Sequence, residues 1–368
     1  MVIRKISYYR VIVSLCLFMF LLSPVFGDEI SAVSFDKELP ENNIVTIQPD
    51  SLRILHNPLT GWVLYASMGV DAADFWAQYD HMYIPELGHN VSVTDYAHTL
   101  YIRASWTDFN PQEDVYGWKI DSNLRAYIEG AYQRNMRLAF RVVVDSRDKR
   151  TEFTPQFVKD AGAKGFMNKG KWSPYSDDSV FQKYYTKFVK ALAKDFNDPS
   201  KVEFIDGFGL GKWGEYHTMI YSTGDDTPKK AVFDWVTDIY SQAFDKVPVV
   251  INYHRWIGAG KDWVDDEHFA ADSEEMLEEA IKKGYSLRHD AFGMTTYYGS
   301  WERRFAKKYR NICPIIMEGG WIVKSHSYWQ DPRGYRKDSH EDVRRGEFDD
   351  SKEAHVNMMD FRLSLIHI

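Results

Sequence analysis

Two glutamates stand out because each follows an apolar run and is flanked by glycine. Glu215 lies in the segment 208–217 (F-G-L-G-K-W-G-E-Y-H), and Glu318 follows the isoleucine-rich run 315–317 and precedes two glycines. A carboxylate at the end of a buried strand is costly unless it is paired or used. Two facing carboxylates can cleave a glycosidic bond, one as nucleophile and the other as acid and then base. We therefore take Glu215 and Glu318 as the candidate catalytic pair.

The neighbours of each glutamate also allow a structural interpretation. Trp213 would give the Glu215 carboxyl an apolar wall that raises its pKa, as a general acid requires. Glu215 could instead cap a helix or pair with a basic residue. Glu318 could likewise form an ion pair inside the mouth of a barrel with Arg103 or Arg141. The position of both residues at predicted strand ends favours catalysis.

Further polar and aromatic side chains follow other apolar runs and could hold sugar hydroxyls or stack on sugar faces. The hydrogen-bonding candidates are Asp145, Asn252, His254 and Tyr297, and the stacking candidates are Trp106, Trp213 and Trp321. His254 with Asp145 would be compatible with a metal ion. The His-x-His and His-Glu-x-x-His spacings are missing, however, so we expect no metal site and no cofactor.

Seven short runs of β-branched or aromatic residues predict strands separated by helices. They lie at residues 61–67, 99–105, 137–144, 203–210, 247–253, 291–297 and 314–318. The near-continuous apolarity of the third and fifth runs indicates strands that are covered on both faces. The alternation predicts an α/β fold, a (β/α)8 TIM barrel, whose site lies at the carboxyl ends of the strands. Glu215 and Glu318 then follow strands four and seven.

Helical patterns lie between these runs, at residues 121–134, 179–196, 273–283 and 351–361, with Asp121 or Ser122 as the N-cap of the first. Because no eighth run follows the last helix, we expect the barrel of residues 57–362 to be truncated before its eighth strand. Residues 363–368 (L-S-L-I-H-I) match a translated sequencing adapter and are expected to be an artefact. The insertions 146–178 and 321–350 follow strand ends and should shape the cleft.

The amino terminus and the composition restrict the location and the partners. Residues 1–27 combine basic residues, an apolar run and a small-residue cleavage site, which predicts a signal peptide and a secreted or periplasmic protein; residues 28–56 form an extended leader. Cys313 alone then remains, so no internal disulfide is expected. A net charge of -8 without a basic run argues against nucleic acid, and no later run is long enough for an integral membrane span. The expected partner is a carbohydrate, and the oligomeric state stays open.

The segment 106–118 carries a more specific pattern. Its sequence, W-T-D-F-N-P-Q-E-D-V-Y-G-W, resembles the W-x-x-x-E-P-x-x-G-x-Y-x-W segment of clan A glycoside hydrolases, notably the family-42 and family-35 β-galactosidases. The opening 56–62, H-N-P-L-T-G-W, and the Gly-x-Trp-Gly-Glu turn at 211–215 are more similar still to glycosidase-like barrel proteins of Bacteroidetes. The resemblance spans roughly residues 55 to 320. It implies a TIM barrel that hydrolyses O-glycosidic bonds.

The resemblance also implies roles for individual residues. In that clan the acid/base glutamate ends strand four and the nucleophile ends strand seven, which carries these roles over onto Glu215 and Glu318. The clan's strand-two arginine corresponds to Arg103. Its strand-six tyrosine, which touches the nucleophile, corresponds to Tyr297.

The chain departs from the clan at the residue before the acid/base glutamate. Most of the clan has asparagine there, in contact with the sugar 2-hydroxyl, whereas this chain has Gly214. Either Asn252 or His217 replaces that contact, or the substrate is recognised differently. Asn110 is a milder change, at a position where the clan usually has glutamate. The sugar, the linkage and exo or endo action are therefore left open.

Three hypotheses follow. The leading one is a secreted retaining glycoside hydrolase, β-galactosidase-like, that acts on oligo- or polysaccharides by a two-glutamate double displacement. The second is a carbohydrate-binding barrel without catalysis, which Gly214 favours. The third is a metal-dependent hydrolase on the same fold, whose activity a chelator would remove.

Overall fold

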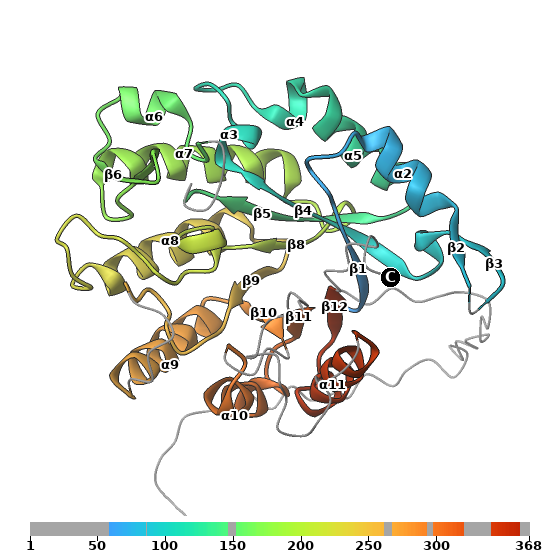
Figure 1. The fold of residues 1–368 in the computed structure, drawn as a ribbon. Helices are drawn as coiled ribbons and strands as arrows, with labels where there is room; N and C mark the ends of the chain where they lie inside the picture. The colour runs from blue at the N-terminus through green and yellow to red at the C-terminus, as the bar shows by residue number, and fades with distance from the viewer. Residues whose placement is uncertain are drawn as a thin grey trace, which may run out of the picture. The chain divides into compact units, whose positions relative to one another are not determined.

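Eight parallel strands form a closed barrel in the computed structural model, which describes residues 59–85, 87–145, 152–260, 267–292, 297–319 and 340–360. Around the barrel the strand order is β1-β12-β11-β10-β9-β8-β5-β4 (Figure 1). The strand bounds are β1 Gly61–Tyr65, β4 Ala97–Ser105, β5 Arg137–Val143, β8 Val202–Asp206, β9 Val249–Asn252, β10 Ser286–Phe292, β11 Ile315–Gly319 and β12 Met358–Asp360. The fold class is therefore the predicted TIM barrel.

Helices lie on the outside of the barrel and connect successive strands (Figure 1). Their bounds are α2 Ala72–Asp80, α3 Trp106–Phe109, α4 Gly117–Ile120, α5 Ser122–Gln133, α6 Gln156–Asp160, α7 Ser179–Phe196, α8 Lys229–Ala243, α9 Glu267–Lys282, α10 Ser300–Tyr309 and α11 His340–Glu353. The short elements are the hairpins β2 Met82–Ile84 with β3 His89–Val91 and β6 Gly165–Asn168 with β7 Lys171–Pro174, and the 3-10 turns η1 Val93–Asp95 and η2 Lys212–Gly214.

Most predicted elements coincide with observed ones. Six of the seven predicted strands correspond to β1, β4, β5, β8, β9 and β11, and two predicted helices correspond to α5 and α7. Asp121 is the N-cap of α5, because its side chain accepts a hydrogen bond of 2.7 Å from the Leu124 amide. The third predicted helix begins earlier than expected, at Glu267 in α9. The signal peptide 1–27, the leader 28–56, the tail 363–368 and Trp321 lie outside the described residues.

The sixth strand was wrongly placed and the eighth was missed. Strand β10 covers 286–292 instead of 291–297, because its charged residues face the barrel interior and so break the apolar pattern that marks a buried strand. The expected truncation before strand eight is wrong: α11 ends at Glu353 and the three-residue strand β12 follows. Its Met358 aligns with Gly61 of β1 and with Ile316 of β11, which closes the barrel. A strand this short lacks a recognisable pattern.

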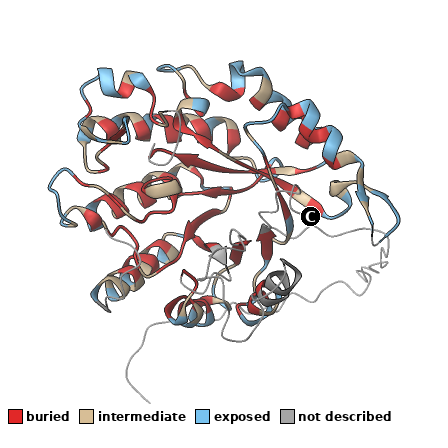
Figure 2. Ribbon diagram, in the orientation of Figure 1, coloured by how far each residue is buried: buried red, intermediate tan, exposed pale blue. Residues whose placement is uncertain are grey.

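The barrel interior is apolar at the end where the strands begin. The side chains that fill it come from successive strands, and buried residues follow the strands and the inner faces of the helices (Figure 2). The members of this apolar layer are Leu59, Val63, Tyr101, Ala139, Phe204, Val250, Ile316 and Met358. Because this end is filled, a site inside the barrel is expected at the opposite, carboxyl end of the strands.

Trp106 belongs to the core between barrel and helices. Its ring is fully buried and packs against Phe181, Tyr185 and Phe188, with centroids 6.0, 5.1 and 5.7 Å away. The expectation that Trp106 stacks on a sugar is wrong, because α3 begins at this residue and directs its ring towards α7. The aromatic pattern of segment 106–118 therefore supports packing here.

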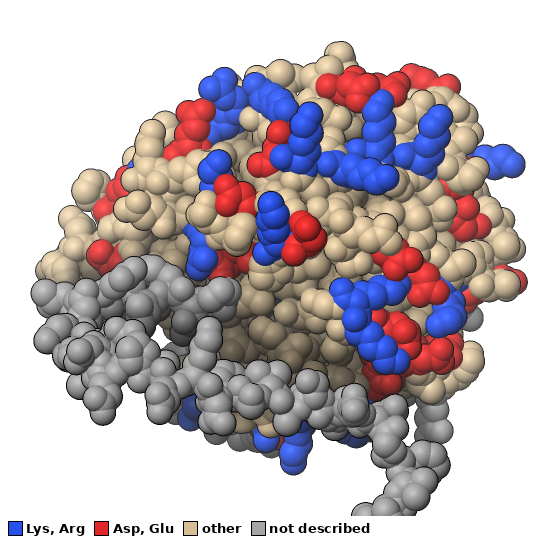
Figure 3. Space-filling model, turned by 180° about the vertical axis from the view of Figure 1, so that it is seen from behind, with Lys and Arg blue, Asp and Glu red and all other residues tan. Residues whose placement is uncertain are grey.

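The outer surface carries both signs of charge. On the face shown in Figure 3, basic side chains lie among acidic ones. Ionic contacts also join neighbouring helices, such as that of Lys308 in α10 with Glu274 in α9 at 2.8 Å. Among the helices within the described ranges, none is both long and apolar enough to cross a membrane.

Candidate active site

A layer of charged side chains lies directly above the apolar layer of the barrel. Strand alternation places it there, since residues two apart face the same side. On β4 and β5, Tyr101 and Ala139 of the apolar layer are followed two positions later by Arg103 and Arg141, which are aligned in the ladder. Fully or almost fully buried charges from other strands complete this charged layer: Asp206, Arg288, Asp290 and Glu318. So many buried charges in one place mark a candidate functional site.

Glu318 ends β11 and is bound by a strong cationic partner. The Nη2 atom of Arg288 donates to its Oε2 at 2.6 Å, and both side chains are buried. A short, charge-assisted contact of this kind stabilises an ionised carboxylate. Glu318 is therefore held in place beside a cation, as the nucleophile of a double displacement must be.

Arg141 links the other carboxylates of the charged layer. Its Nε donates to Asp206 at 2.6 Å, and its Nη2 lies 2.6 Å from Asp290. Its Nη1 is much farther from Glu215, at 3.8 Å from Oε1. Burial by itself would lower the pKa of Arg141, but Asp206 and Asp290 outweigh it, so the pKa is raised and the guanidinium stays charged.

Glu215 is placed by a tight turn after β8. Gly211 and Gly214 have φ of 73° and 75°, and Trp213 between them has φ of 59°. The turn is closed by hydrogen bonds from the Gly214 amide to Gly211 O, 3.1 Å, and from the Glu215 amide to Lys212 O, 3.0 Å. Left-handed backbone favours glycine. Glycine suits this backbone at Gly214, but asparagine also adopts it, so the turn does not explain the difference from the resembling clan.

Two histidines hold Glu215 from the other side. His217 is fully buried with its Nε2 3.5 Å from Oε2 of Glu215, and Nε2 of His254 lies 2.8 Å from the Glu215 backbone oxygen. The Trp256 amide donates to Nδ1 of His254 at 3.1 Å, so Nε2 carries the proton. Burial first, then the nearby His217, lowers the pKa of His254 far below its usual range. His254 is therefore a neutral donor that orients the acid/base loop.

Asn252 and Tyr297 contact each other, and Tyr297 lies near Glu215. The amide nitrogen of Asn252 donates to the hydroxyl of Tyr297 at 3.3 Å, and its oxygen accepts from the Asp290 amide at 3.3 Å. Burial raises the pKa of Tyr297 well above 10.0, and the charge of Glu215 adds to that rise. Tyr297 is thus a neutral phenol close to the acid/base candidate.

Arg103, Trp213 and Asp145 were also predicted for the site. Arg103 donates to the backbone oxygen of Trp213 at 2.6 Å and so fixes the acid/base loop. The Trp213 ring is half-buried, 5.7 Å from the His217 ring and 4.2 Å from the Lys212 ammonium, which lies over the ring. Asp145 follows β5 and is buried, and it accepts from Ser173 at 3.3 Å. The structure thus places Arg103 and Trp213 at the Glu215 turn.

The sequence analysis missed three charged residues of the site: Asp206, Arg288 and Asp290. Arg288 and Asp290 are two apart on β10, and each is buried in the charged layer. Tyr101 donates its hydroxyl to Asp206, which also contacts Arg141 and, at 3.7 Å, Arg288. The available signal was the pair of charged residues two positions apart, Arg288 and Asp290, within a segment of strand length. Every strand of a barrel has buried neighbours, so this segment could not be read as a strand on the surface.

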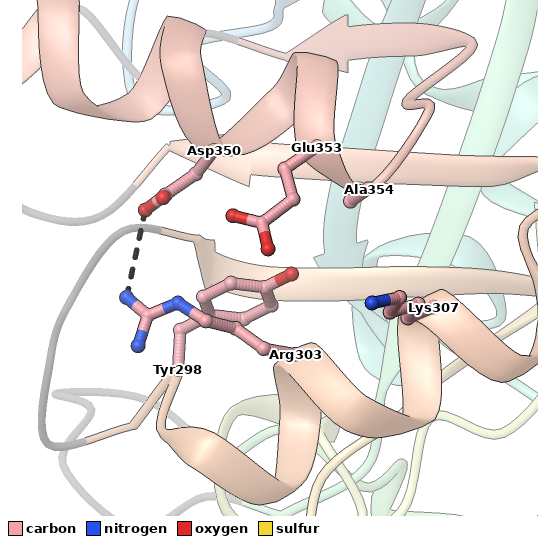
Figure 4. A pocket seen from close by; sticks show the side chains of 6 residues that line it. All are labelled: Tyr298, Arg303, Lys307, Asp350, Glu353 and Ala354. Carbon is pink, nitrogen blue, oxygen red and sulfur yellow. Dashed lines mark ion pairs between the residues drawn. The ribbon is translucent and has the colours of Figure 1, made fainter.

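A small cavity elsewhere shows how the last two helices meet. It has a volume of about 10 Å³ and lies between α10 and α11 (Figure 4). Its lining consists of Tyr298, Arg303, Lys307, Asp350, Glu353 and Ala354. Arg303 and Asp350 form an ion pair of 3.7 Å across it.

Within the described ranges, no three His, Cys, Asp or Glu side chains are grouped so that they could hold a metal ion.

Replacing Arg288 should strongly destabilise the fold. The substitution Arg288→Met leaves Asp290 and Glu318 without their shared cation, and breaking a buried pair costs about 3–5 kcal/mol. Urea unfolding measures the difference. The control Lys282→Met breaks an exposed pair with Glu279 and should leave the unfolding midpoint close to that of wild type. Equal stabilities for the two variants would contradict this account of the charged layer.

Comparison with known proteins shows the fold. Neither a protein-family model nor a curated protein matches the chain. Among solved structures, the chain is similar to an exo-β-1,4-mannosidase from Opitutaceae bacterium strain TAV5, with a TM-score of 0.52 and 13% identity over 82% of this chain. This chain spans 51% of that protein. The endo-1,4-β-mannanase from Rhizomucor miehei gives a TM-score of 0.47 at 11% identity, with 84% of this chain and 87% of that one covered.

Proposed function

We propose that the protein is a retaining glycoside hydrolase in which Glu318 is the nucleophile and Glu215 the acid/base residue. The observation that carries the proposal is the difference between the two environments. Glu318 has a cation at 2.6 Å, whereas the nearest guanidinium nitrogen of Glu215 is 3.8 Å away. A double displacement needs this difference, because one carboxyl must be charged while the other keeps a proton.

Each chemical step follows from these positions. Glu318 attacks the anomeric carbon and forms a glycosyl ester, while Glu215 gives its proton to the departing oxygen. Glu215, now ionised, removes a proton from a water molecule, which attacks the anomeric carbon and releases Glu318. Arg288 keeps Glu318 ionised and aimed, and Arg103 and His254 hold the loop that carries Glu215.

The sugar contact that asparagine makes in the resembling clan needs another donor. The amide of Asn252 is engaged at both ends, with Tyr297 and with the Asp290 amide. His217 lies 3.5 Å from Glu215 and is the better candidate for the 2-hydroxyl contact. The segment 106–118 favours a β-galactoside, and the similar mannosidase suggests that a β-mannoside should be tested too.

The test is a screen of the full chain, expressed with its own amino terminus, against aryl β-galactosides, β-mannosides, β-glucosides and β-xylosides. Release of aryl alcohol by wild type and not by Glu318→Gln is the expected result. Localisation is tested in the same culture: the predicted signal peptide places the activity in the periplasm or medium.

Gly214 favours a second candidate function, a carbohydrate-binding barrel without turnover. Calorimetric titration with oligosaccharides separates the two. Sugar binding that is equal in wild type and Glu318→Gln, with no hydrolysis by either, would support the binding protein and overturn the enzyme.

A further inference from the structure

Asp290 lies between the two arginines of the charged layer. Its Oδ2 is 2.6 Å from Nη2 of Arg141, and its Oδ1 accepts from Nε of Arg288 at 2.8 Å. Its amide donates to Asn252 at 3.3 Å, so its position on β10 is fixed from the neighbouring strand. One carboxylate therefore contacts Arg141, which faces Glu215, on one side, and both Arg288 and Glu318 on the other.

This bridge coincides with the unequal pairing of the glutamates. Arg288 reaches Glu318 at 2.6 Å while it also binds Asp290 through a different nitrogen. Nε of Arg141 pairs with Asp206, and its Nη2 pairs with Asp290. Its Nη1 faces Glu215, at 3.8 Å. That distance is beyond a hydrogen bond. The two carboxylates that bind Arg141 thus keep its guanidinium beyond hydrogen-bonding distance of Glu215.

We propose that Asp290 is a positioning residue that holds Arg141 away from Glu215, so that the guanidinium stays beyond hydrogen-bonding distance of the acid/base glutamate. The inference rests on the proposed function. It adds a residue that contacts neither the departing oxygen nor the anomeric carbon and that acts on Glu215 through Arg141. Nothing in the clan's sequence pattern, as it appears in this chain, pointed to this position.

Asp290 itself must be charged for this role. Burial alone would raise its pKa, but Arg141, Arg288 and a side-chain hydrogen bond with Glu318 outweigh burial and lower that pKa below its usual range. The groups that face Glu215 are Arg141, at 3.8 Å from β5, His217 at 3.5 Å from its own loop, the neutral His254 after β9, and Tyr297 after β10. Arg141 is the permanent cation among these four.

The decisive variant is Asp290→Asn, which keeps the shape and removes the charge. Arg141 then loses one of its two close carboxylates and can approach Glu215. A closer cation stabilises ionised Glu215, so its pKa falls and the upper limb of the kcat/KM profile moves to lower pH by about one unit. Because proton donation is impaired, the rate loss should be larger for aryl glycosides with poor leaving groups than for activated ones.

The opposite change provides an independent test. Arg141→Gln removes the cation next to Glu215, so the upper limb should move to higher pH. Glu203→Gln is the matched control, because it removes a buried carboxylate that pairs with Arg137 at 2.5 Å at the other end of the barrel. Neither its upper limb nor its dependence on the leaving group should differ from wild type.

A titration by NMR with carbon-13 in the glutamate carboxyl groups separates this inference from the proposed function. It follows Glu215, assigned with Glu215→Gln, whether or not any glycoside is cleaved. A lower Glu215 pKa in Asp290→Asn supports the inference. An unchanged Glu215 pKa, or an equal rate loss for all leaving groups, would overturn it. Absence of hydrolysis by wild type would instead overturn the proposed function.

Discussion

Glu318→Gln should reduce glycoside hydrolysis by about 10⁴-fold or more. The amide cannot form the glycosyl ester, yet its oxygen can still accept from Arg288, now at 2.6 Å from the carboxylate. The loss should therefore appear in kcat, with the fold and the KM little changed. Initial rates on the best aryl glycoside, with a melting curve for each protein, measure it.

The same variant distinguishes chemistry from folding. Glu203→Gln removes another buried carboxylate, one that lies far from the proposed reacting atoms. This control should keep its rate within a few-fold of wild type. If Glu318→Gln also kept a comparable rate, Glu318 would not be the nucleophile.

Glu215→Ala should produce a loss that depends on the leaving group. Without the acid, glycosides with poor leaving groups should be cleaved about 10² to 10⁴-fold more slowly, whereas activated aryl glycosides should form the ester at nearly normal rates. Water activation is also lost, so the ester should accumulate. The upper limb of the kcat/KM profile should disappear, because it reports the ionisation of this carboxyl. Stopped-flow measurement of the burst, with a series of aryl glycosides that carry different phenols as leaving groups and at several pH values, tests all three results.

An equal loss with every leaving group would assign Glu215 to substrate binding. Lys212→Ala in the same loop serves as the control, since Lys212 contacts the outer face of Trp213 at 4.2 Å from the ring. It should keep the wild-type dependence on the leaving group.

Much of the barrel could be predicted because its strands carry a strong local signal. Strand β5 is a nearly continuous apolar run that Arg141 alone interrupts, and α7 presents its aromatic residues on one side, so both were placed within a residue or two. Strand β10 could not be placed in this way. Its charged residues are stable inside only because Arg288, Asp290 and Glu318 meet there from two strands. The sequence of one segment alone does not show that charged residues of two strands contact each other.

The site was predicted unevenly for the same reason. Glycines and apolar runs mark Glu215 and Glu318 locally, and the structure brings both into one charged cluster with His217, Asn252 and Tyr297. Trp106 was misassigned because an aromatic residue after a strand can face the core or the mouth, and helix packing decides which. The missing eighth strand had too few residues to show any period.

Trapping the glycosyl-enzyme tests the central claim most directly. A 2-deoxy-2-fluoro glycoside of the sugar that the enzyme cleaves best, with an activated leaving group, forms the ester and slows its hydrolysis. Mass spectrometry of the digested protein should find the added sugar on the peptide that contains Glu318. A label on another residue, or rapid turnover of the substrate with inversion and no label, would contradict the proposed mechanism.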